Sequence, residues 1–330
     1  MRTTSDPPPG PTPQTSPPSA GSTRPAPGPP AARHSGGWRS SPYLPGAVLA
    51  FVIVIWGLGP PVSKLITAPP LVTASVRFWV SVPILLVLLY GTGHRLTVAT
   101  LRRTAVAGAL FGFNMACVFA ALQHASVAVM TVMQALQPGI VLILAGRWLG
   151  ERATAWHVGF TLVGIGGVAT VVFGNSPKVH SDALGVLFAM AAMLSFTGYY
   201  LINRRVRSTV DIHPLEWMTG STIFSALAVT PLALAVSSPA DYRLLGGADW
   251  LYLAFVTGAV GIFGHTMMSW VHRYVPASRS SLYLLGMTVV AMLAAWPIHD
   301  EPITAQQALG GLVVLGAVAA VVSRPPARAT

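Results

Sequence analysis

The chain has 330 residues, of which 53% are hydrophobic and only 9% carry a charge, and its mean hydropathy is +0.62. Soluble domains carry about 25% charged residues, so this composition excludes an ordinary soluble fold and predicts several membrane-spanning helices. The formal net charge of +11 does not indicate a nucleic-acid partner, because the basic residues stand singly or in pairs between apolar stretches. The one cysteine, Cys117, lies inside an apolar stretch, so neither a disulfide framework nor a zinc motif is expected.

Residues 1–44 are dominated by proline, serine, threonine and glycine. Such a stretch has almost nothing to bury and is expected to be a disordered cytoplasmic tail, with an inert extension favoured over a ligand for a PxxP-binding partner. It contains no continuous apolar core followed by a small-residue cleavage site, so a signal peptide is not expected. Residues 324–330 are expected to form a second short cytoplasmic tail.

Ten apolar segments follow the first tail, each close to the about 20 residues that a helix needs to cross about 30 Å of hydrocarbon. Backbone polar groups cannot remain unpaired in lipid, so the segments are expected to be helices and the fold class is an all-α integral membrane protein with ten transmembrane helices. Their approximate limits are 45–63, 70–90, 104–122, 126–146, 155–173, 184–202, 214–236, 250–271, 277–297 and 304–323.

The basic residues predict the orientation of these helices. With a cytoplasmic N-terminus, sixteen of the twenty arginines and lysines fall on the cytoplasmic side, and only Lys64, Lys178 and Arg243 fall outside. This bias follows the positive-inside rule and supports an even number of spans with both termini in the cytoplasm.

Two stretches of the chain repeat each other. Residues 149–172 and 299–322 align without gaps at an offset of 150 and share ten identities. Such a repeat fixes the architecture, and the offset divides the chain into two five-helix repeats, residues 45–174 and 182–323. Because five is odd, the repeats must cross the membrane in opposite directions. Inverted repeats place a binding site near the midplane where they meet, which is the logic of a transporter.

Several short motifs occur in a fixed order along these repeats. They are WG and K in the first segment (Trp56, Gly57, Lys64), RF in the second (Arg77, Phe78), LGE after the fourth (Leu149, Gly150, Glu151), GVLFAMAAMLSFTGYYLINRR in the sixth, and VPASRSS (Val275 to Ser281) followed by Glu301. Together with the duplication, they resemble the EamA-type transporters of the drug/metabolite transporter superfamily over residues 45–323. Two positions depart from that pattern: Thr288 stands at the counterpart of Pro138, and Phe196 stands where a tryptophan is expected.

The resemblance implies a secondary transporter that moves small organic metabolites, such as amino-acid-like or drug-like solutes, by alternating access. Export across the plasma membrane is the expected direction, and the expected partners are the lipid bilayer, the solute and protons as a candidate coupling ion. No enzyme activity and no cofactor are expected, because the sequence contains no HExxH, GxSxG or paired deep carboxylates. A membrane-embedded enzyme and a passive channel are the alternatives, and the low polarity of the spans argues against a channel.

Arg77 is the charged residue inside the second apolar segment. A charge within the bilayer is costly, by about 2.5 to 3.5 kcal/mol on insertion scales, so its side chain is expected to face protein or water. It could bind an anionic group of the solute through its guanidinium. Alternatively, it could bond neighbouring helix carbonyls or extend toward the interface, and its shallow depth favours this structural role.

His265 lies in the middle of the eighth segment, after three glycines at a spacing of three residues. Histidine titrates near neutral pH, so His265 is a candidate proton relay as well as a solute contact. A buried histidine with satisfied ring nitrogens is the more common situation.

Three amides and several aromatic residues complete the candidate solute site. Gln134 and Gln137 share one helical face next to Pro138, which can kink the helix, and Asn114 lies in the third segment. The alternative role for these amides is to join helices. Among the aromatic residues, the candidates are Trp56, Tyr199, Trp270 and Tyr283, with anchoring at the membrane interface as the alternative.

Glu151 and Glu301 are interpreted as structural markers of the repeat. Each stands three residues before a threonine that can cap the next helix, where negative charge is favoured by the helix dipole. The inverted topology puts them on opposite sides of the membrane, so they cannot form one site. The row His299, Asp300 and Glu301 is too short to converge on a metal ion, and no metal site is expected.

Overall fold

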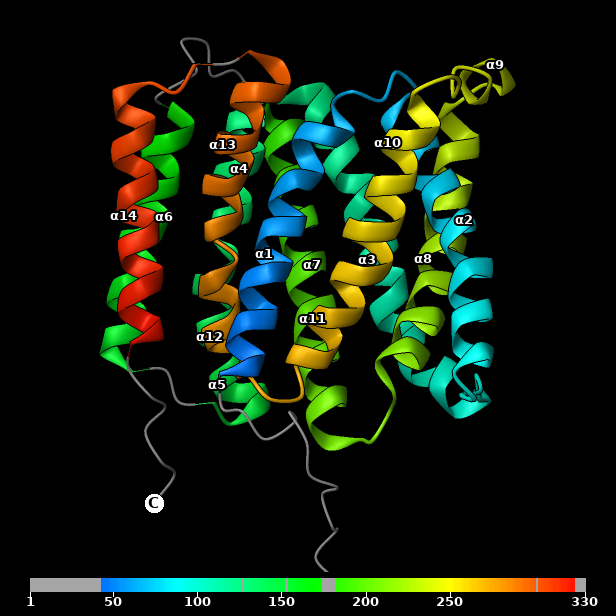
Figure 1. The fold of residues 1–330 in the computed structure, drawn as a ribbon, viewed down its shortest axis with the longest axis horizontal. Coiled ribbons are helices and arrows are strands. Elements are labelled where there is room, and N and C mark those ends of the chain that lie inside the picture. Colours follow the sequence, from blue (N-terminus) through cyan, green and yellow to red (C-terminus); the bar gives the residue numbers. More distant parts are fainter. Residues whose placement is uncertain (1–42, 126, 152–153, 174–181, 301, 324–330) are drawn as a thin grey trace, which may run out of the picture. The chain divides into compact units, whose positions relative to one another are not determined.

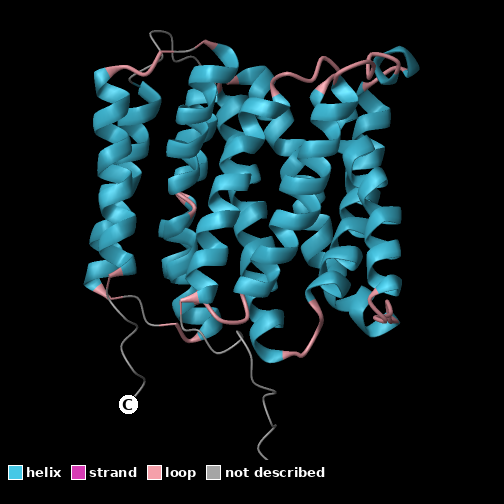
Figure 2. Ribbon diagram, in the orientation of Figure 1, coloured by secondary structure: helices cyan, strands magenta, loops and turns pink. Residues whose placement is uncertain are grey.

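The computed structural model describes residues 43–125, 127–151, 154–173, 182–300 and 302–323, and the regular elements in these ranges are helices (Figure 2). The two expected tails, apart from residues 43 and 44, and the marker Glu301 lie outside the described residues.

The N-terminal half, residues 44–173, contains α1 (Leu44–Ser63), α2 (Pro70–Gly91), α3 (Val98–His124), α4 (Val127–Ala135), α5 (Gln137–Leu149) and α6 (Ala155–Phe173). The C-terminal half, residues 183–323, contains α7 (Ala183–Thr209), α8 (Pro214–Val236), α9 (Pro239–Tyr242), α10 (Asp249–Phe255), the π-helix η2 (Val256–Gly264), α11 (His265–Val271), α12 (Ala277–Tyr283), α13 (Gly286–His299) and α14 (Ala305–Val322).

Most of these helices are long and apolar enough to cross a membrane. Within the described residues, eight helical runs have this length and composition, and a shorter apolar helix, Ala305–Val321, accompanies them. Figure 1 shows the helices side by side, with their ends gathered at two faces of the bundle. We call these faces the Glu151 end, which holds the loops after α2, α5, α7 and α11, and the Asp249 end, which holds the loops after α1 and α8.

The two halves interleave. Helix α3 packs along α7 and α8, α2 packs along α8, α6 packs along α14, and α1 packs along α13 and η2. Each of these main pairings joins a helix of one half to a helix of the other. The hydrophobic core therefore lies mostly between the halves, and a site at its centre takes side chains from both.

Glycine allows the closest of these approaches. Gly108 and Gly112 stand four residues apart on α3 and face the backbone of Ser221 and Ser225 on α8. The Ser225 hydroxyl donates to the Gly108 carbonyl at 2.8 Å. Small residues at this spacing let membrane helices meet at their backbones, and in lipid such packing replaces the hydrophobic driving force.

Two of the predicted spans are broken at their centres. The fourth changes from α4 to α5 at Leu136, just before Pro138, as expected from a residue that has no backbone N–H. The ninth changes from α12 to α13 at Leu284 and Leu285, although Thr288 replaces the proline, and the amides there bond three residues back. In Figure 1 these two broken spans run in opposite directions between the ends. The break is therefore a property of the fold and does not require proline.

We predict that Gly112→Ala lowers the free energy of unfolding by about 1–3 kcal/mol, the usual cost of overpacking. An added Cβ would lie 2.6 Å from the Ser225 carbonyl oxygen. Thermal unfolding in detergent measures the effect. Gly166→Ala on α6 is the matched control, because no atom lies within 4 Å of a Cβ at that position. Equal unfolding temperatures for the two variants would contradict the packing argument.

Candidate functional site

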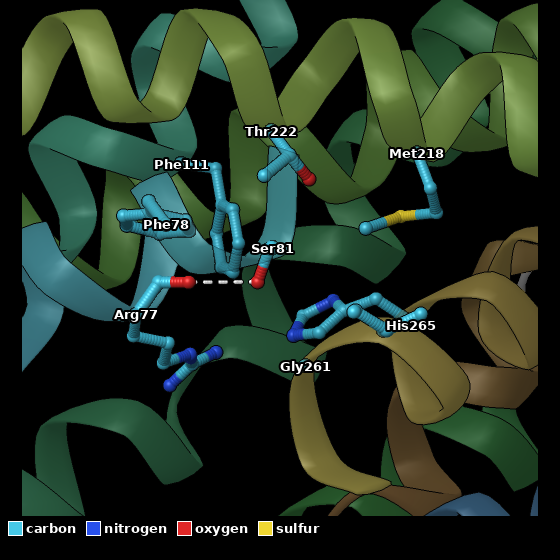
Figure 3. Close-up of a pocket in the computed structure, with 9 residues that line it drawn as sticks. Arg77, Phe78, Ser81, Phe111, Met218, Thr222, Gly261 and His265 are labelled. Carbon is cyan, nitrogen blue, oxygen red and sulfur yellow. Dashed lines mark hydrogen bonds between the residues drawn. The ribbon is translucent and has the colours of Figure 1, made fainter. Parts of the chain in front are cut away.

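A small cavity lies where helices of the two halves meet (Figure 3). The cavity has a volume of about 10 Å³, measured as the space that the centre of a water molecule can occupy, so it has room for a single water molecule. Helices α2 and α3 line one side of it, and α8, η2 and α11 line the other. The lining residues are Arg77, Phe78, Ser81, Phe111, Met218, Thr222, Gly261, Ile262 and His265.

Arg77 brings an uncompensated charge to this cavity. Its guanidinium makes no hydrogen bond or ion pair with any residue that the structure describes, and its nearest ring contact is Phe78, 5.7 Å from the ring centre. The hydrogen bond drawn in Figure 3 joins the Ser81 hydroxyl to the Arg77 backbone carbonyl at 2.8 Å. A Cβ at residue 261 would lie 3.5 Å from Arg77 Nε, so glycine at that position leaves the guanidinium its space.

His265 faces the same space from the opposite half. It is the first residue of α11, directly after the π-helix η2, an irregularity that is frequent at functional sites. The side chain is 6% exposed, and its Nδ1 atom is buried without a hydrogen-bond partner among the described residues. The sequence argument favoured a satisfied histidine, but the structure leaves Nδ1 unsatisfied.

Aromatic rings enclose His265. The ring centres of Trp56, Phe111 and Tyr199 lie 4.5, 4.7 and 6.2 Å from that of His265. Trp56 is held by a hydrogen bond of 3.1 Å from its indole nitrogen to the Val260 carbonyl in η2. Gly264 makes room for this indole, since a Cβ there would lie 2.5 Å from Nε1. Trp56 and Tyr199 therefore contact His265, although neither of them lines the cavity.

The predicted amides lie outside this cavity. Asn114 is 1% exposed, and its side-chain amide donates to the Ala192 carbonyl at 2.8 Å, so it joins α3 to α7. Gln137 is buried at the break between α4 and α5, and its Nε2 atom has no partner among the described residues. Gln134 is half-buried on α4. Asn114 therefore has a structural role in this conformation, whereas Gln137 has an amide free to bind.

The remaining aromatic candidates belong to a neighbouring cluster. Trp270 and Tyr283 are partly buried and pack against the hydrophobic core that contains Trp56 and Tyr200. Trp270 also contacts Tyr274, with ring centres 4.7 Å apart. Neither residue lines the cavity.

Sequence reasoning missed Phe111, Met218 and Thr222 as lining residues. Phe111 stands beside Gly112 on the face of α3 that enters the core, and only the pairing of α3 with α7 and α8 shows where that face lies. Gly261 belongs to the three glycines that precede His265 at a spacing of three residues, and this spacing is the signal in the sequence that indicates a close approach here.

Glu151 forms a second site at one end of the bundle. Its Oε1 accepts hydrogen bonds from Arg204 Nε and the Ala277 amide, both at 3.0 Å, and Oε2 accepts from the Ser278 amide at 3.0 Å and the Ser278 hydroxyl at 2.9 Å. Arg204 also donates to the His272 carbonyl. We call this group, Glu151 with Arg204 and the start of α12, the clasp. One carboxylate thus ties α5 of the N-terminal half to α7 and α12 of the C-terminal half.

The clasp extends the structural interpretation of Glu151. Thr154 does cap α6, because its hydroxyl accepts from the His157 amide at 3.4 Å. However, the Glu151 carboxylate is placed at the beginning of α12, a helix far along the chain, where the amide groups and the helix dipole favour a negative charge. No local pattern in the sequence links these segments.

Metal binding has no support among the described residues, where no group of three His, Cys, Asp or Glu side chains could hold an ion. A larger cavity of about 320 Å³ lies near the Asp249 end, lined by Pro69, Pro70, Leu71, Gln123, Val236, Ser237 and Asp241. The carboxylate of Asp241 is engaged by the backbone and hydroxyl of Ser238. The central cavity is therefore the better candidate for solute binding.

Comparisons with known proteins agree with this architecture. The model of the EamA-like transporter family matches twice, at residues 44–173 and 183–323. An uncharacterized transporter of Archaeoglobus fulgidus is 26% identical over 276 residues, which cover 82% of this chain and 95% of that protein. The uncharacterized transporter YyaM of Bacillus subtilis is 24% identical over 261 residues, covering 76% of this chain and 84% of YyaM.

One solved crystal structure has the same fold, with a TM-score of 0.70 at 20% identity, covering 84% of this chain and 97% of its own. The two family matches together cover most of the 330 residues. The chain therefore belongs to the EamA-like transporter family and is a multi-pass membrane transporter.

Proposed function

We propose that this protein is a secondary transporter for small organic solutes that carry a carboxylate, and that the solute binds between Arg77 and His265. The observation that carries the proposal is the guanidinium of Arg77, which has no partner among the described residues and lies in a cavity between the two halves. Amino-acid-like and drug-like acids fit this description, and export across the plasma membrane is the proposed direction.

The chemistry of the cavity supports an anionic ligand with an apolar body. A buried cation without a counter-ion is costly unless a ligand or water compensates it. The guanidinium offers a planar fork of donors that matches a carboxylate. Phe78, Phe111 and Met218 provide the apolar wall on which the rest of the solute can pack.

The proposed architecture is ten spans in two inverted five-helix repeats, with both termini in the cytoplasm. In this orientation sixteen basic residues lie on the cytoplasmic side and three on the outer side, which agrees with the positive-inside rule. The broken spans α4–α5 and α12–α13 occupy corresponding places in the two halves and run in opposite directions. Such paired discontinuous helices are typical of transporters that alternate access around a central site.

In this orientation the clasp closes the cytoplasmic end. The Asp249 end is also tied across the halves, because Asp249 accepts from the hydroxyl of Thr67 at 2.5 Å and His299 contacts the Pro61 carbonyl at 2.9 Å. A central cavity with room for only one water molecule favours a carrier over a passive channel. Transport then requires the two ends to open in turn.

We predict that Arg77→Gln reduces counterflow of a carboxylate solute about 10- to 100-fold, because a charge-assisted hydrogen bond contributes about 1.5–3 kcal/mol. Arg77→Lys should retain part of the activity. Reconstituted vesicles loaded with unlabelled benzoate and given labelled benzoate outside provide the measurement. Arg243→Gln, an exposed loop arginine, is the matched control. Equal losses for benzoate and for uncharged benzamide would assign Arg77 a purely structural role.

His265 remains a candidate proton relay. We predict that His265→Gln, which keeps a polar side chain but cannot titrate, removes the pH dependence of solute counterflow between pH 5 and 8. The pH profile of the initial rate is the measurement. An unchanged profile would place proton coupling on another group.

We predict that Glu151→Gln opens the cytoplasmic end about tenfold more often, since weakening a buried charged network by about 1.4 kcal/mol changes an equilibrium tenfold. Cys117→Ala with Ser281→Cys provides a fully buried reporter thiol on α12. Its labelling rate with a membrane-impermeant maleimide in inside-out vesicles is the measurement. Glu216→Gln at the same end is the matched control. Identical labelling of the two variants would show that the clasp does not control opening.

A further inference from the structure

Two histidines mark the ends of α11: His265 is its first residue and His272 directly follows its last residue. His265 and His272 are seven residues apart, which is about two helical turns or roughly 10 Å along the axis. His272 is fully buried, and neither of its ring nitrogens has a hydrogen-bond partner among the described residues. Its ring stands at 80° to that of Tyr200, with the centres 4.4 Å apart. A second unsatisfied histidine thus lies between the central cavity and the clasp.

Arg207 lies beside this second histidine. It is only 2% exposed, its Nε donates to the Ser269 carbonyl at 3.1 Å, and its Nη1 is buried without a partner among the described residues. Asn203 stands one turn earlier on α7, also buried, and its side-chain oxygen accepts from the Ser269 hydroxyl at 3.4 Å. Guanidinium, imidazole and amide groups therefore gather between α7 and α11.

The nearby carboxylates are engaged elsewhere. Asp211 pairs with Arg273 at the surface, and this contact lowers the pKa of the Asp211 carboxyl. Glu216 lies 3.4 Å from His94, and Glu151 is held by Arg204 and α12. Arg207 is thus buried without a salt bridge to any carboxylate among the described residues, which is unfavourable for a charged side chain.

We propose that Arg207, His272 and Asn203 form a second binding station for a small carboxylate, on the route between the central cavity and the Glu151 end. A bound carboxylate would satisfy Arg207 Nη1 and an imidazole N–H, the donors that now have no acceptor. A solute moving between Arg207 and Arg77 would pass along the side of α11 on which His265 and His272 lie.

The clasp is directly connected to this station. Arg204 bonds both the Glu151 carboxylate and the backbone carbonyl of His272. Opening the clasp therefore releases the backbone at His272 and gives solute access to Arg207. The route as a whole rests on the proposed transport function, whereas the station itself can be tested by binding.

Thermal unfolding of the full-length protein in detergent at rising benzoate concentration tests the station, because a ligand that binds the folded state raises the unfolding temperature. We expect benzoate to stabilise the wild type and, less strongly, Arg77→Gln and Arg207→Gln, while the double variant loses the effect. The exposed neighbour Arg205→Gln should behave as the wild type. Without benzoate, Arg207→Gln should unfold at the same or a higher temperature, because it removes an unpaired buried charge.

The outcomes separate the two sites. Loss of all benzoate stabilisation in Arg77→Gln alone would overturn the Arg207 station and leave the central site intact. Loss in Arg207→Gln alone would overturn the central site. No benzoate effect on the wild type would overturn both. A lower unfolding temperature of Arg207→Gln without benzoate, with unchanged benzoate stabilisation, would assign Arg207 to structure.

Transport in reconstituted vesicles gives a second measurement, the benzoate KM on each side of the membrane, which a purely structural role of Arg207 would not change on one side alone. Arg207→Gln should raise the benzoate KM at the Glu151 side at least about tenfold and change the KM at the other side less than about twofold, as expected for one lost charged hydrogen bond. Arg207→Lys should restore part of the affinity. Equal changes of KM on the two sides would overturn a sided station.

Discussion

The cost of an unpaired charge inside an apolar bundle governs this structure. The chain has nine acidic residues against twenty arginines and lysines. The acidic side chains that the structure describes lie at the ends of the bundle. Glu151 holds Arg204 and α12, Asp249 holds Thr67, and Asp211 holds Arg273. No carboxylate among the described residues remains for Arg77 or Arg207. The buried arginines therefore favour the binding of an anion from outside the protein.

Interleaving of the two halves brings this charge to a site. Arg77 on α2 reaches His265 because α2 packs against both α8 and η2. Glycine at positions 261 and 264 leaves room for the Arg77 guanidinium and the Trp56 indole. The π-helix then aims His265 at the same space. Helix pairing, the two glycines and the π-helix thus act together to place the cation and the imidazole at one cavity.

The parts of the fold and the candidate site that could be predicted from the sequence are those that depend on residue type and on neighbours along the chain. Hydropathy and turn residues indicated the membrane-spanning segments, and the repeat indicated the duplication, because both are written along the chain. Arg77, His265, Trp56 and Tyr199 were recognised as candidates from residue type and depth. Whether these residues come together, and whether Phe111 joins them, depends on which helices pack against each other. In lipid, helices pack where glycines let their backbones approach closely, and hydropathy does not reveal these positions.

Arg207 and Glu151 show the limits of a hydropathy argument most clearly. The sixth segment was expected to end near residue 202, where the arginines begin, but α7 continues to Thr209 and buries Arg207. Likewise, Glu151 was expected to serve the helix that follows it, and its carboxylate instead meets α12, more than a hundred residues away. In both cases a polar residue was assigned to the surface because its partners are distant in sequence.

The clasp suggests how solute binding and opening are coupled. A ligand shifts a conformational equilibrium only through its different affinity for the two states. With the clasp closed, Arg204 is neutralised by Glu151 while Arg207 is not, so a carboxylate gains most in the state that exposes Arg207 and His272. The same anion also supplies negative charge near Arg204 when Glu151 withdraws, which lowers the electrostatic cost of opening. In the proposed transport cycle this compensation is missing without solute, so the Glu151 end would stay closed, as alternating access without leakage requires.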